Sequence, residues 1–247
     1  MRAQPLPGTV IDLASGQRLD EAAFVKRAAN APRLLLGERH DQATDHAAQR
    51  WLLQALQQQR PHGALVLEMI ASERQPRLDR VQRWLAKGNR ADGTRLQELL
   101  DWDARWPWAA YGGLVQDATA AGIPLFGGNL SRAEVNAWLA SNASVRFPMP
   151  TARQRLSVVV LAQHAGAAPM LEGMLAVQQA RDIRMAQVLA AAPAPALLVA
   201  GRWHVLRGTG VPGYLPPDAP ALVIALASPG ETVDAADADL LWVLGDE

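Results

Sequence analysis

The sequence predicts an α/β fold with a mostly parallel central sheet and helices on both of its faces. Short apolar runs, typical of buried strands, end in glycine or in a polar residue, and longer segments with apolar residues at helical spacing separate them. The 247 residues contain no internal repeat and no linker long enough to require a second domain. We therefore expect a single domain over residues 1–247.

Each predicted strand is an apolar run of strand length bounded by turn residues. The run Leu34-Leu35-Leu36 meets Gly37, and the run at 197–200 ends in the same way at Gly201. Such a run is how a buried strand of an α/β sheet reads. In chain order we expect a small strand within residues 9–20 and sheet strands at 34–36, 64–67, 125–128, 197–200, 221–226 and 240–244.

The predicted helices begin at capping residues or prolines and end at turn signals. Asp41 can cap the helix that follows the first sheet strand, and its negative charge suits a helix N-terminus. Pro107 suits a first helical turn, and Ser131 with Glu134 fits a capping box. We expect helices over residues 20–30, from Asp41 onward, and over 73–87, 107–121, 132–140, 151–165 and 169–191.

Polar residues follow four of the apolar runs within a few positions. Glu38 and His40 follow the first, Glu68 the second, Asn129 the third and His204 the fourth. The carboxyl ends of parallel strands lie on one edge of a sheet, where α/β proteins place their ligands. We therefore expect these side chains to converge on one pocket.

The composition limits the partners and the chemistry. Lys and Arg together number 24, as do Asp and Glu, so no global field attracts nucleic acid or an anionic membrane. The absence of cysteine excludes disulfides, thiolate metal sites and a cysteine nucleophile. We find neither a signal-peptide pattern nor an apolar run long enough to span a bilayer, and expect no integral membrane segment. The expected location is cytoplasmic, or that of the mature form of an exported protein.

Motifs spread from about residue 10 to 226 resemble those of the ChaN-like haem-binding proteins (haem-binding uptake, Tiki superfamily). The matching motifs are Leu-Leu-Gly-Glu-x-His with a second His six residues on, Leu-Glu-Met at 67–69, the Trp-rich stretch at 102–111, Gly-Ile-Pro-Leu with Asn129-Leu130, His164, the Gln178-x3-Asp182-x2-Met185-Ala186 helix, and the Ala-Gly-x2-His-Val stretch at 200–212. Their shared order and spacing make the resemblance specific.

The resemblance implies an α/β protein, similar also to erythromycin esterases, that binds haem in a pocket at the carboxyl edge of the sheet. It implies a role in haem or iron uptake or handling, often as a bacterial lipoprotein, and in some members a homodimer with haems at the interface. Tyrosinate ligation of the iron is also implied, and Tyr111 and Tyr214 are the two tyrosines of the chain. We assign Tyr111, which lies in the Trp-rich motif, as the ligand of the haem iron.

Each residue assigned to haem binding could instead have a purely structural role. The residues assigned to cofactor binding are Tyr111, His204, His46, His164, Trp108 and Asn129. A buried Tyr that bonds its neighbours, and Trp102, Trp106 and Trp108 as core residues, are the alternatives. The candidate partners of the propionates are Arg181, Arg184, Arg202 and Arg207, and for these a solvated face is the alternative.

Three possibilities besides haem binding stay open. Glu38, His40 and Glu68 fit an acid–base set for hydrolysis of an ester or amide, since a Glu that orients a His makes the His a competent base. No Gly-x-Ser-x-Gly motif is present, so hydrolysis would proceed by direct activation of water. The two histidines, His40 and His46, with a carboxylate also fit a divalent metal site. The third possibility is a scaffold without catalysis that binds a partner.

Overall fold

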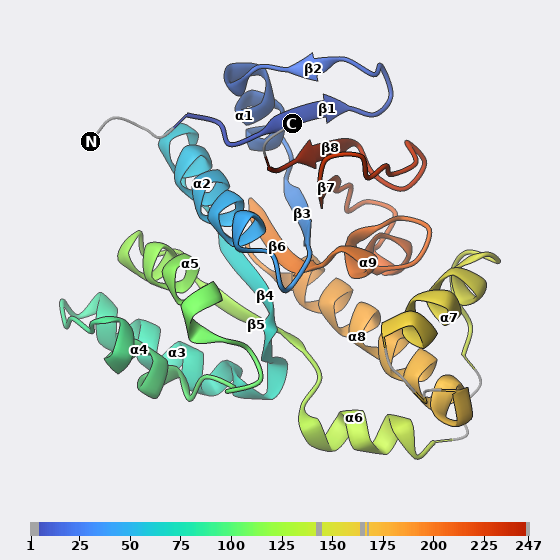
Figure 1. The fold of residues 1–247 in the computed structure, drawn as a ribbon. Coiled ribbons are helices and arrows are strands. Elements are labelled where there is room, and N and C mark those ends of the chain that lie inside the picture. The colour runs from blue at the N-terminus through green and yellow to red at the C-terminus, as the bar shows by residue number, and fades with distance from the viewer. Residues whose placement is uncertain (1–4, 142–144, 164–165, 167, 246–247) are drawn as a thin grey trace.

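A computed structural model describes residues 5–141, 145–163, 166 and 168–245. Eight strands of this part of the chain form one sheet in the order β2-β1-β8-β7-β3-β6-β4-β5 (Figure 1). The strands are β1 (Thr9–Asp12), β2 (Arg18–Leu19), β3 (Arg33–Glu38), β4 (Ala64–Ala71), β5 (Leu125–Asn129), β6 (Ala196–Gly201), β7 (Leu222–Ala227) and β8 (Leu240–Val243). Every pair from β8 to β5 is parallel, and β1 and β2 are antiparallel additions at one edge. The α/β fold and the mostly parallel sheet are confirmed.

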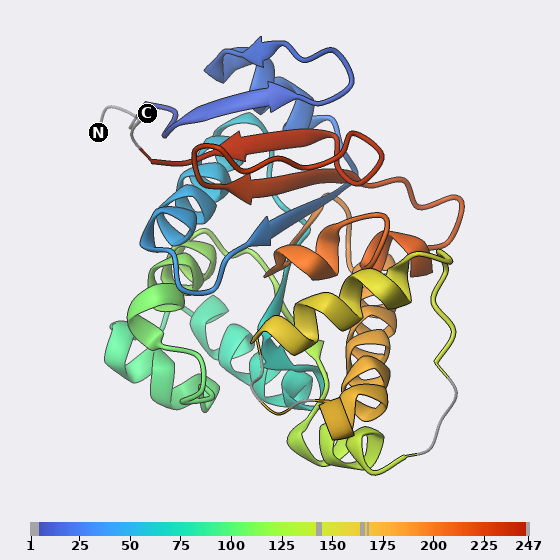
Figure 2. The same cartoon turned by 45° about the vertical axis from the view of Figure 1, so that its right-hand side comes forward.

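Helices cover both faces of the sheet. They are α1 (Glu21–Ala29), α2 (Ala43–Gln59), α3 (Gln75–Ala86), α4 (Gly93–Leu100), α5 (Trp108–Ala120), α6 (Arg132–Leu139), α7 (Ala152–Gln163), α8 (Leu171–Ala191) and α9 (Arg202–Val205), with 3-10 turns η1 (Ser72–Arg74), η2 (Ala168–Met170) and η3 (Val211–Tyr214). Figures 1 and 2 both show α3, α4 and α5 gathered on one side and α6, α7 and α8 on the other.

The side chains of β3 contribute to the hydrophobic cores on both faces of the sheet. Successive side chains of a strand point to opposite faces of the sheet. Leu34 and Leu36 accordingly join the core beneath α1, α2 and α5, whereas Leu35 joins the core beneath α8 and α9. All three are at most 2% exposed, so both faces of this strand are buried.

Several helix boundaries differ from the predictions for local reasons. The predicted N-cap Asp41 is wrong, because α2 begins at Ala43 after Gln42, and Gln42 makes no capping bond with its side chain. The capping box of Ser131 and Glu134 is confirmed. Helix α4 was not predicted. Its N-cap is Asp92, whose carboxylate accepts a bond from the backbone N–H of Arg95.

Strand β4 runs further than its apolar residues suggest. It continues through Glu68 to Ala71, with an irregular register against β5 after Leu67. Glu68 therefore lies within the strand and not beyond it. Among the described residues, no helix is both long and apolar enough to cross a membrane.

Candidate functional site

The carboxylate of Glu38 is the centre of the first half of a polar cluster at the carboxyl edge of the sheet. Glu38 ends β3 and is only 2% exposed. Its Oε1 lies 2.8 Å from Nδ1 of His40 and accepts a bond of 2.7 Å from the hydroxyl of Tyr111. Its Oε2 accepts a bond from the side-chain amide of Gln49 and lies 3.6 Å from Nε2 of His46. Helices α2 and α5 thus deliver donors to one buried carboxylate.

The turn between β3 and α2 presents His40 to solvent. Oδ2 of Asp45, in the first turn of α2, accepts a bond of 2.8 Å from the backbone N–H of Arg39 and one of 3.1 Å from its Nε. This pair fixes the turn, and the following His40 keeps 44% of its side chain exposed. With Nδ1 directed at Glu38, the ring has one orientation and turns Nε2 outward from that carboxylate.

Glu68 is the centre of the second half of the cluster. It is 2% exposed, and its Oε2 accepts a bond of 2.7 Å from the backbone N–H of Gly201. Its Oε1 lies 3.5 Å from Nε2 of His204, and Nδ1 of the same ring lies 2.6 Å from Oδ1 of Asp182. Strand β4, helix α8 and helix α9 therefore place an imidazole between two buried carboxylates.

The two halves meet above Gly201. A β-carbon added to this glycine would lie 2.8 Å from Nε2 of His40 and 3.5 Å from Oε2 of Glu68. The absence of a side chain at Gly201 is what allows the imidazole and the carboxylate to converge there. The predicted convergence of Glu38, His40, Glu68 and His204 is therefore present in the structure.

The charges of the second half are mutually dependent. Burial disfavours the ionised form of Glu68, but His204, His40 and Arg181 outweigh burial and lower the pKa of Glu68. Burial likewise opposes the charged form of His204, yet Glu68 and Asp182 raise the pKa of His204. Burial raises the pKa of Asp182 to about 6 despite the neighbouring imidazole. The neighbouring carboxylates thus favour the protonated form of His204.

The first half also favours a protonated imidazole. Burial acts to lower the pKa of His40, and the bond to Glu38 with the charge of Glu68 reverses this and raises the pKa. Burial and the adjacent Glu38 raise the pKa of Tyr111, so its hydroxyl stays neutral and donates to that carboxylate.

An aromatic group covers the first half of the cluster. The ring of Trp106 packs edge-on against His40 at 4.9 Å between centroids and against Tyr111 at 5.7 Å. Trp102 packs against Trp108 at 5.1 Å and donates its indole N–H to the backbone oxygen of Trp106. All three indoles are partly buried against the core beneath α2 and α5. This arrangement matches the alternative of core residues for the Trp-rich motif.

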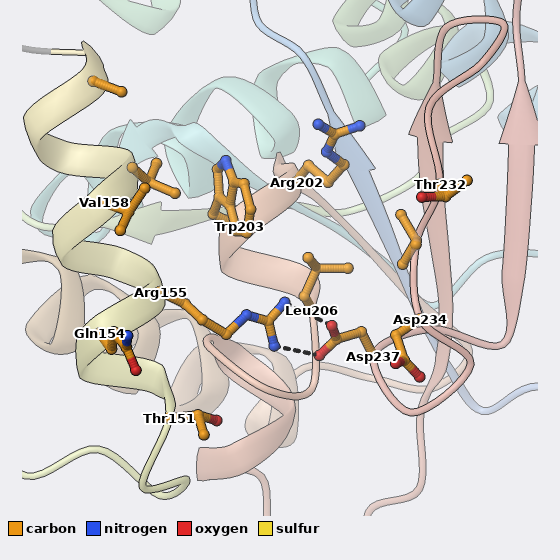
Figure 3. Close-up of a pocket in the computed structure, with 13 residues that line it drawn as sticks. Thr151, Gln154, Arg155, Val158, Arg202, Trp203, Leu206, Thr232, Asp234 and Asp237 are labelled. Atoms are coloured by element: carbon orange, nitrogen blue, oxygen red, sulfur yellow. Dashed lines mark hydrogen bonds and ion pairs between the residues drawn. The ribbon is translucent and has the colours of Figure 1, made fainter.

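A cleft of about 940 Å³ lies beside the cluster, between α7, α9 and the loop at 228–239 (Figure 3). The walls are mostly apolar, and the loop leaves the carboxyl end of β7, as α9 leaves that of β6. The lining residues are Thr151, Gln154, Arg155, Val158, Val159, Ala162, Arg202, Trp203, Leu206, Thr232, Val233, Asp234 and Asp237. The cleft and the polar cluster adjoin at Gly201 and Arg202, which are neighbours in sequence.

Two arginines of the cleft are held by carboxylates of the loop. Arg155 donates to both oxygens of Asp237, at 2.9 and 2.6 Å (Figure 3). Arg202 donates to Glu231 at 3.0 Å, and Glu231 also accepts a bond of 3.1 Å from Arg39. The loop is therefore attached to α7 and α9 through ion pairs.

The residues predicted to bind the cofactor gather at the cluster and not at the cleft. None of Tyr111, His204, His46, Trp108 and Asn129 lines the cleft. The side-chain amide of Asn129 donates to the backbone oxygen of Glu68 and its oxygen accepts from the backbone of Leu130. Its contacts are thus those of a residue that fixes the end of β4. His164 lies outside the described residues. The assignment of these residues to haem stays a prediction.

Several residues of the two regions escaped prediction. Asp182, named above only within a matching motif, and Gln49 are a buried acceptor and donor in the cluster, and each is a polar interruption of the buried face of its helix. That interruption is the signal by which the sequence could have indicated them. Arg155 and Trp203 had no such signal, because the cleft arises only when α7 packs beside α9.

The chemistry available to the cluster is proton transfer. A half-exposed imidazole oriented by Glu38 converges with a buried carboxylate, which is the arrangement of a general base. The divalent metal site proposed from His40 and His46 finds no support, since the described part of the chain holds no group of three or more His, Asp or Glu side chains arranged for a metal ion.

Comparison with known proteins places the chain among haem-binding relatives. Residues 24–215 match the family model described as haem-binding uptake, Tiki superfamily, ChaN. A solved structure of ChaN from Campylobacter jejuni, described as binding haem cofacially, has a TM-score of 0.85 and 24% identity over 95% of this chain and 96% of that chain. A mutant erythromycin esterase in its open conformation has a TM-score of 0.52 and 18% identity over 92% of this chain and 78% of that one. No protein of curated function matches.

Proposed function

We propose that this chain, which belongs to the ChaN family of the haem-binding uptake, Tiki superfamily, binds haem in the cleft between α7 and α9. One observation carries the choice of place: the cleft combines a volume of about 940 Å³ with apolar walls and two guanidinium groups at the carboxyl edge of the sheet. An apolar slot with cations for the propionates is what a porphyrin requires.

The residues of the cleft suit the porphyrin and its propionates. Val158 of α7 faces Trp203 and Leu206 across it, and Val159 also lines the cleft (Figure 3). Transfer of apolar surface from water contributes about 25 cal/mol per Å², so walls of this kind supply much of the binding free energy of a flat apolar ligand. Arginine binds carboxylates through two parallel bonds, and Arg155 already does so with Asp237.

The cleft suits the iron of haem less well than it suits the porphyrin and its propionates. Imidazole, phenolate, thiolate and thioether groups are the usual axial ligands of haem. The described residues that line the cleft include no His, Tyr or Met. Tyr111 is wholly buried, and its hydroxyl would have to leave Glu38 and the core to reach the iron. The hydroxyl of Tyr214 lies 3.2 Å from the side-chain amide of Gln179.

A role in haem uptake or handling is part of the proposal, and membership of this family supports it. The predicted homodimer and the link to iron supply rest on the same resemblance. Haem bound at an open cleft is suited to transfer between partners, because one side of the site remains accessible. The apolar side chains of Val158 and Leu161 on α7 are 64% and 44% exposed, so this helix offers apolar surface both to a ligand and to solvent.

The test is a titration of the purified protein with haem, followed by the shift of the Soret band. Val158→Asp places a charge in the cleft, and we expect haem affinity to fall at least about tenfold, because the carboxylate is desolvated on binding. The matched control is Leu161→Asp, on the same helix and exposed, but outside the cleft. Equal affinity of both variants, or no saturable shift in the unmodified protein, would end the proposal.

A second candidate function, hydrolysis of an ester or amide, is favoured by the convergence of His40 and Glu68 above Gly201. In this proposal the neutral form of His40 accepts a proton from water at Nε2 while the water oxygen bonds to the carbonyl carbon. The imidazolium then gives this proton to the leaving group as the bond between that group and the carbonyl carbon breaks. Glu38 holds Nδ1 of the ring and stabilises the imidazolium that forms.

A panel of esters tests this second candidate. His40→Ala removes the base and is expected to lower the rate by about 10²-fold or more. Leu161→Asp serves as the control for handling and purity, since it touches neither the cluster nor the cleft. Rates that are equal in His40→Ala and in the unmodified protein would remove the candidate.

A further inference from the structure

We infer that the cleft recognises the porphyrin ring and its two propionates and not the iron, so that a metal-free porphyrin dicarboxylate is a ligand in its own right. The inference rests on the proposed haem site and names the class of ligand that this site accepts. Its basis is the mismatch between what the cleft provides for the organic part of haem and what it provides for the metal.

The polar atoms that line the cleft belong to groups that bind carboxylates or water. They are the guanidinium groups of Arg155 and Arg202, the amide of Gln154, hydroxyls of threonine and carboxylates of aspartate. None of these is a usual ligand of haem iron. A ligand held through such groups and through apolar walls gains no affinity from its metal.

The nearest imidazoles at the adjoining polar cluster have other partners. His204 is 7% exposed and lies between Asp182 and Glu68. His40 directs Nδ1 to Glu38, and its Nε2 faces the space above Gly201, where Glu68 also converges. Neither ring is among the residues that line the cleft, and ligation of iron by His204 would disturb its bond to Asp182.

The two arginines are able to exchange their present partners for propionates. When a propionate replaces Asp237 on Arg155, Asp237 keeps a bond of 2.9 Å from the backbone N–H of Gly208. When a propionate replaces Glu231 on Arg202, Glu231 keeps bonds from the backbone of Ser228 and from Arg39. On Arg202 the exchange replaces a carboxylate that is 36% exposed, whereas the side chain of Asp237 is only 9% exposed, so a propionate on Arg155 must outweigh the loss of a buried ion pair.

The apolar contacts between the cleft and a porphyrin likewise do not depend on the metal. Trp203 and Val158 approach the cleft from opposite sides, α9 and α7 (Figure 3). Stacking of a porphyrin on an indole, with an aliphatic side chain beyond, depends on the flat macrocycle, which is the same with and without iron. All tetrapyrrole dicarboxylates have the flat macrocycle and the two carboxylates that the cleft is proposed to bind.

The experiment compares three ligands by fluorescence quenching of tryptophan: haem, protoporphyrin IX and the dimethyl ester of protoporphyrin IX. We expect the Kd values of haem and protoporphyrin IX to agree within about threefold, and the ester to bind at least about tenfold more weakly, because it has lost both charges. Arg155→Met should weaken haem and protoporphyrin IX by the same factor. Arg153→Met is the control, on the same helix and paired with Glu172 outside the cleft.

The outcomes separate the inference from the proposed function. Saturable binding of haem without binding of protoporphyrin IX would overturn the inference and leave the haem site standing, since iron would then carry the affinity. If neither haem nor protoporphyrin IX binds, both the inference and the proposed function are overturned. Binding of both ligands that is unchanged in Arg155→Met and Val158→Asp would place the porphyrin elsewhere and also overturn the inference.

Discussion

The polar cluster and the cleft lie side by side at the same edge of the sheet, yet they are built in opposite ways. In the cluster, buried carboxylates of Glu38 and Glu68 are surrounded by donors from helices and strands. Beside the cleft, the carboxylates belong to the loop at 228–239, where the side chain of Glu231 is 36% exposed and that of Asp237 is 9% exposed. The first region is a network of buried polar groups, whereas the second is a mostly apolar cleft bordered by ion pairs.

This difference indicates that the cluster is better suited to catalysis and the cleft to binding a large ligand. Buried carboxylates that accept bonds from several donors resist rearrangement, because a lost bond leaves a desolvated charge. A partly exposed ion pair contributes little and exchanges readily. Catalysis requires the first property and binding of a large carboxylated ligand requires the second. We therefore expect separate substitutions to affect the cluster and the cleft independently.

The largest contrast is expected in stability. Glu38→Ala removes the acceptor of Tyr111 and Gln49 and should lower the free energy of unfolding by about 3–5 kcal/mol. Glu231→Ala removes an acceptor of Arg39 and Arg202 at the surface and should lower it by about 1 kcal/mol or less. Urea unfolding measures both values. Equal losses would show that the two networks do not differ as described.

Gly37→Ala should affect both regions at once. An added methyl group would collide with the side chain of Val205 and lie 3.0 Å from Cα of Arg202, so α9 must move. Overpacking of this kind lowers the free energy of unfolding by about 1–3 kcal/mol. Because α9 carries Trp203 and His204, we expect haem affinity and the pKa of His204 to change together. NMR titration and haem titration of one sample check this, and a change in only one of them would contradict the shared support.

Gly201→Ala should instead act on the cluster alone. The new methyl group would displace the ring of His40 from above Glu68 and weaken its bond to Glu38. We expect the raised pKa of His40 to fall back towards the ordinary value of about 6.5, while haem affinity stays the same. The Cε1–H resonance of His40, followed against pH, reports the first part. A loss of haem affinity would show that the regions are not independent.

The smallest effect concerns the pH dependence of stability. The pKa of His204 is raised in the folded protein, so its stabilising contribution is complete below the unfolded value of about 6.5 and is lost as the pH rises through the folded value. His40 contributes with the same sign. In His204→Asn the decline of the unfolding free energy above pH ~6.5 should be shallower than in the unmodified protein. An unchanged slope in urea unfolding would contradict the charge assignment.

The sequence allowed prediction of the cluster but not of the cleft, for a physical reason. Glu38, Glu68 and His204 follow apolar runs, and parallel strands bring their ends to one edge, so local pattern and topology together place them. Asp182 belongs to the same cluster but lies on a long helix, where its partner depends on how α8 packs on the sheet. The walls of the cleft come from α7, α9 and a loop, whose lateral packing no local pattern specifies.

One pair of titrations tests the separation of the two regions most directly: haem added to Val158→Asp and to His40→Ala, with the Soret band as the readout. Both side chains are exposed, so both variants should fold. We predict that Val158→Asp loses at least about tenfold in affinity and that His40→Ala binds haem like the unmodified protein. The reverse result, with affinity lost in His40→Ala and retained in Val158→Asp, would place the haem at the polar cluster and contradict the account.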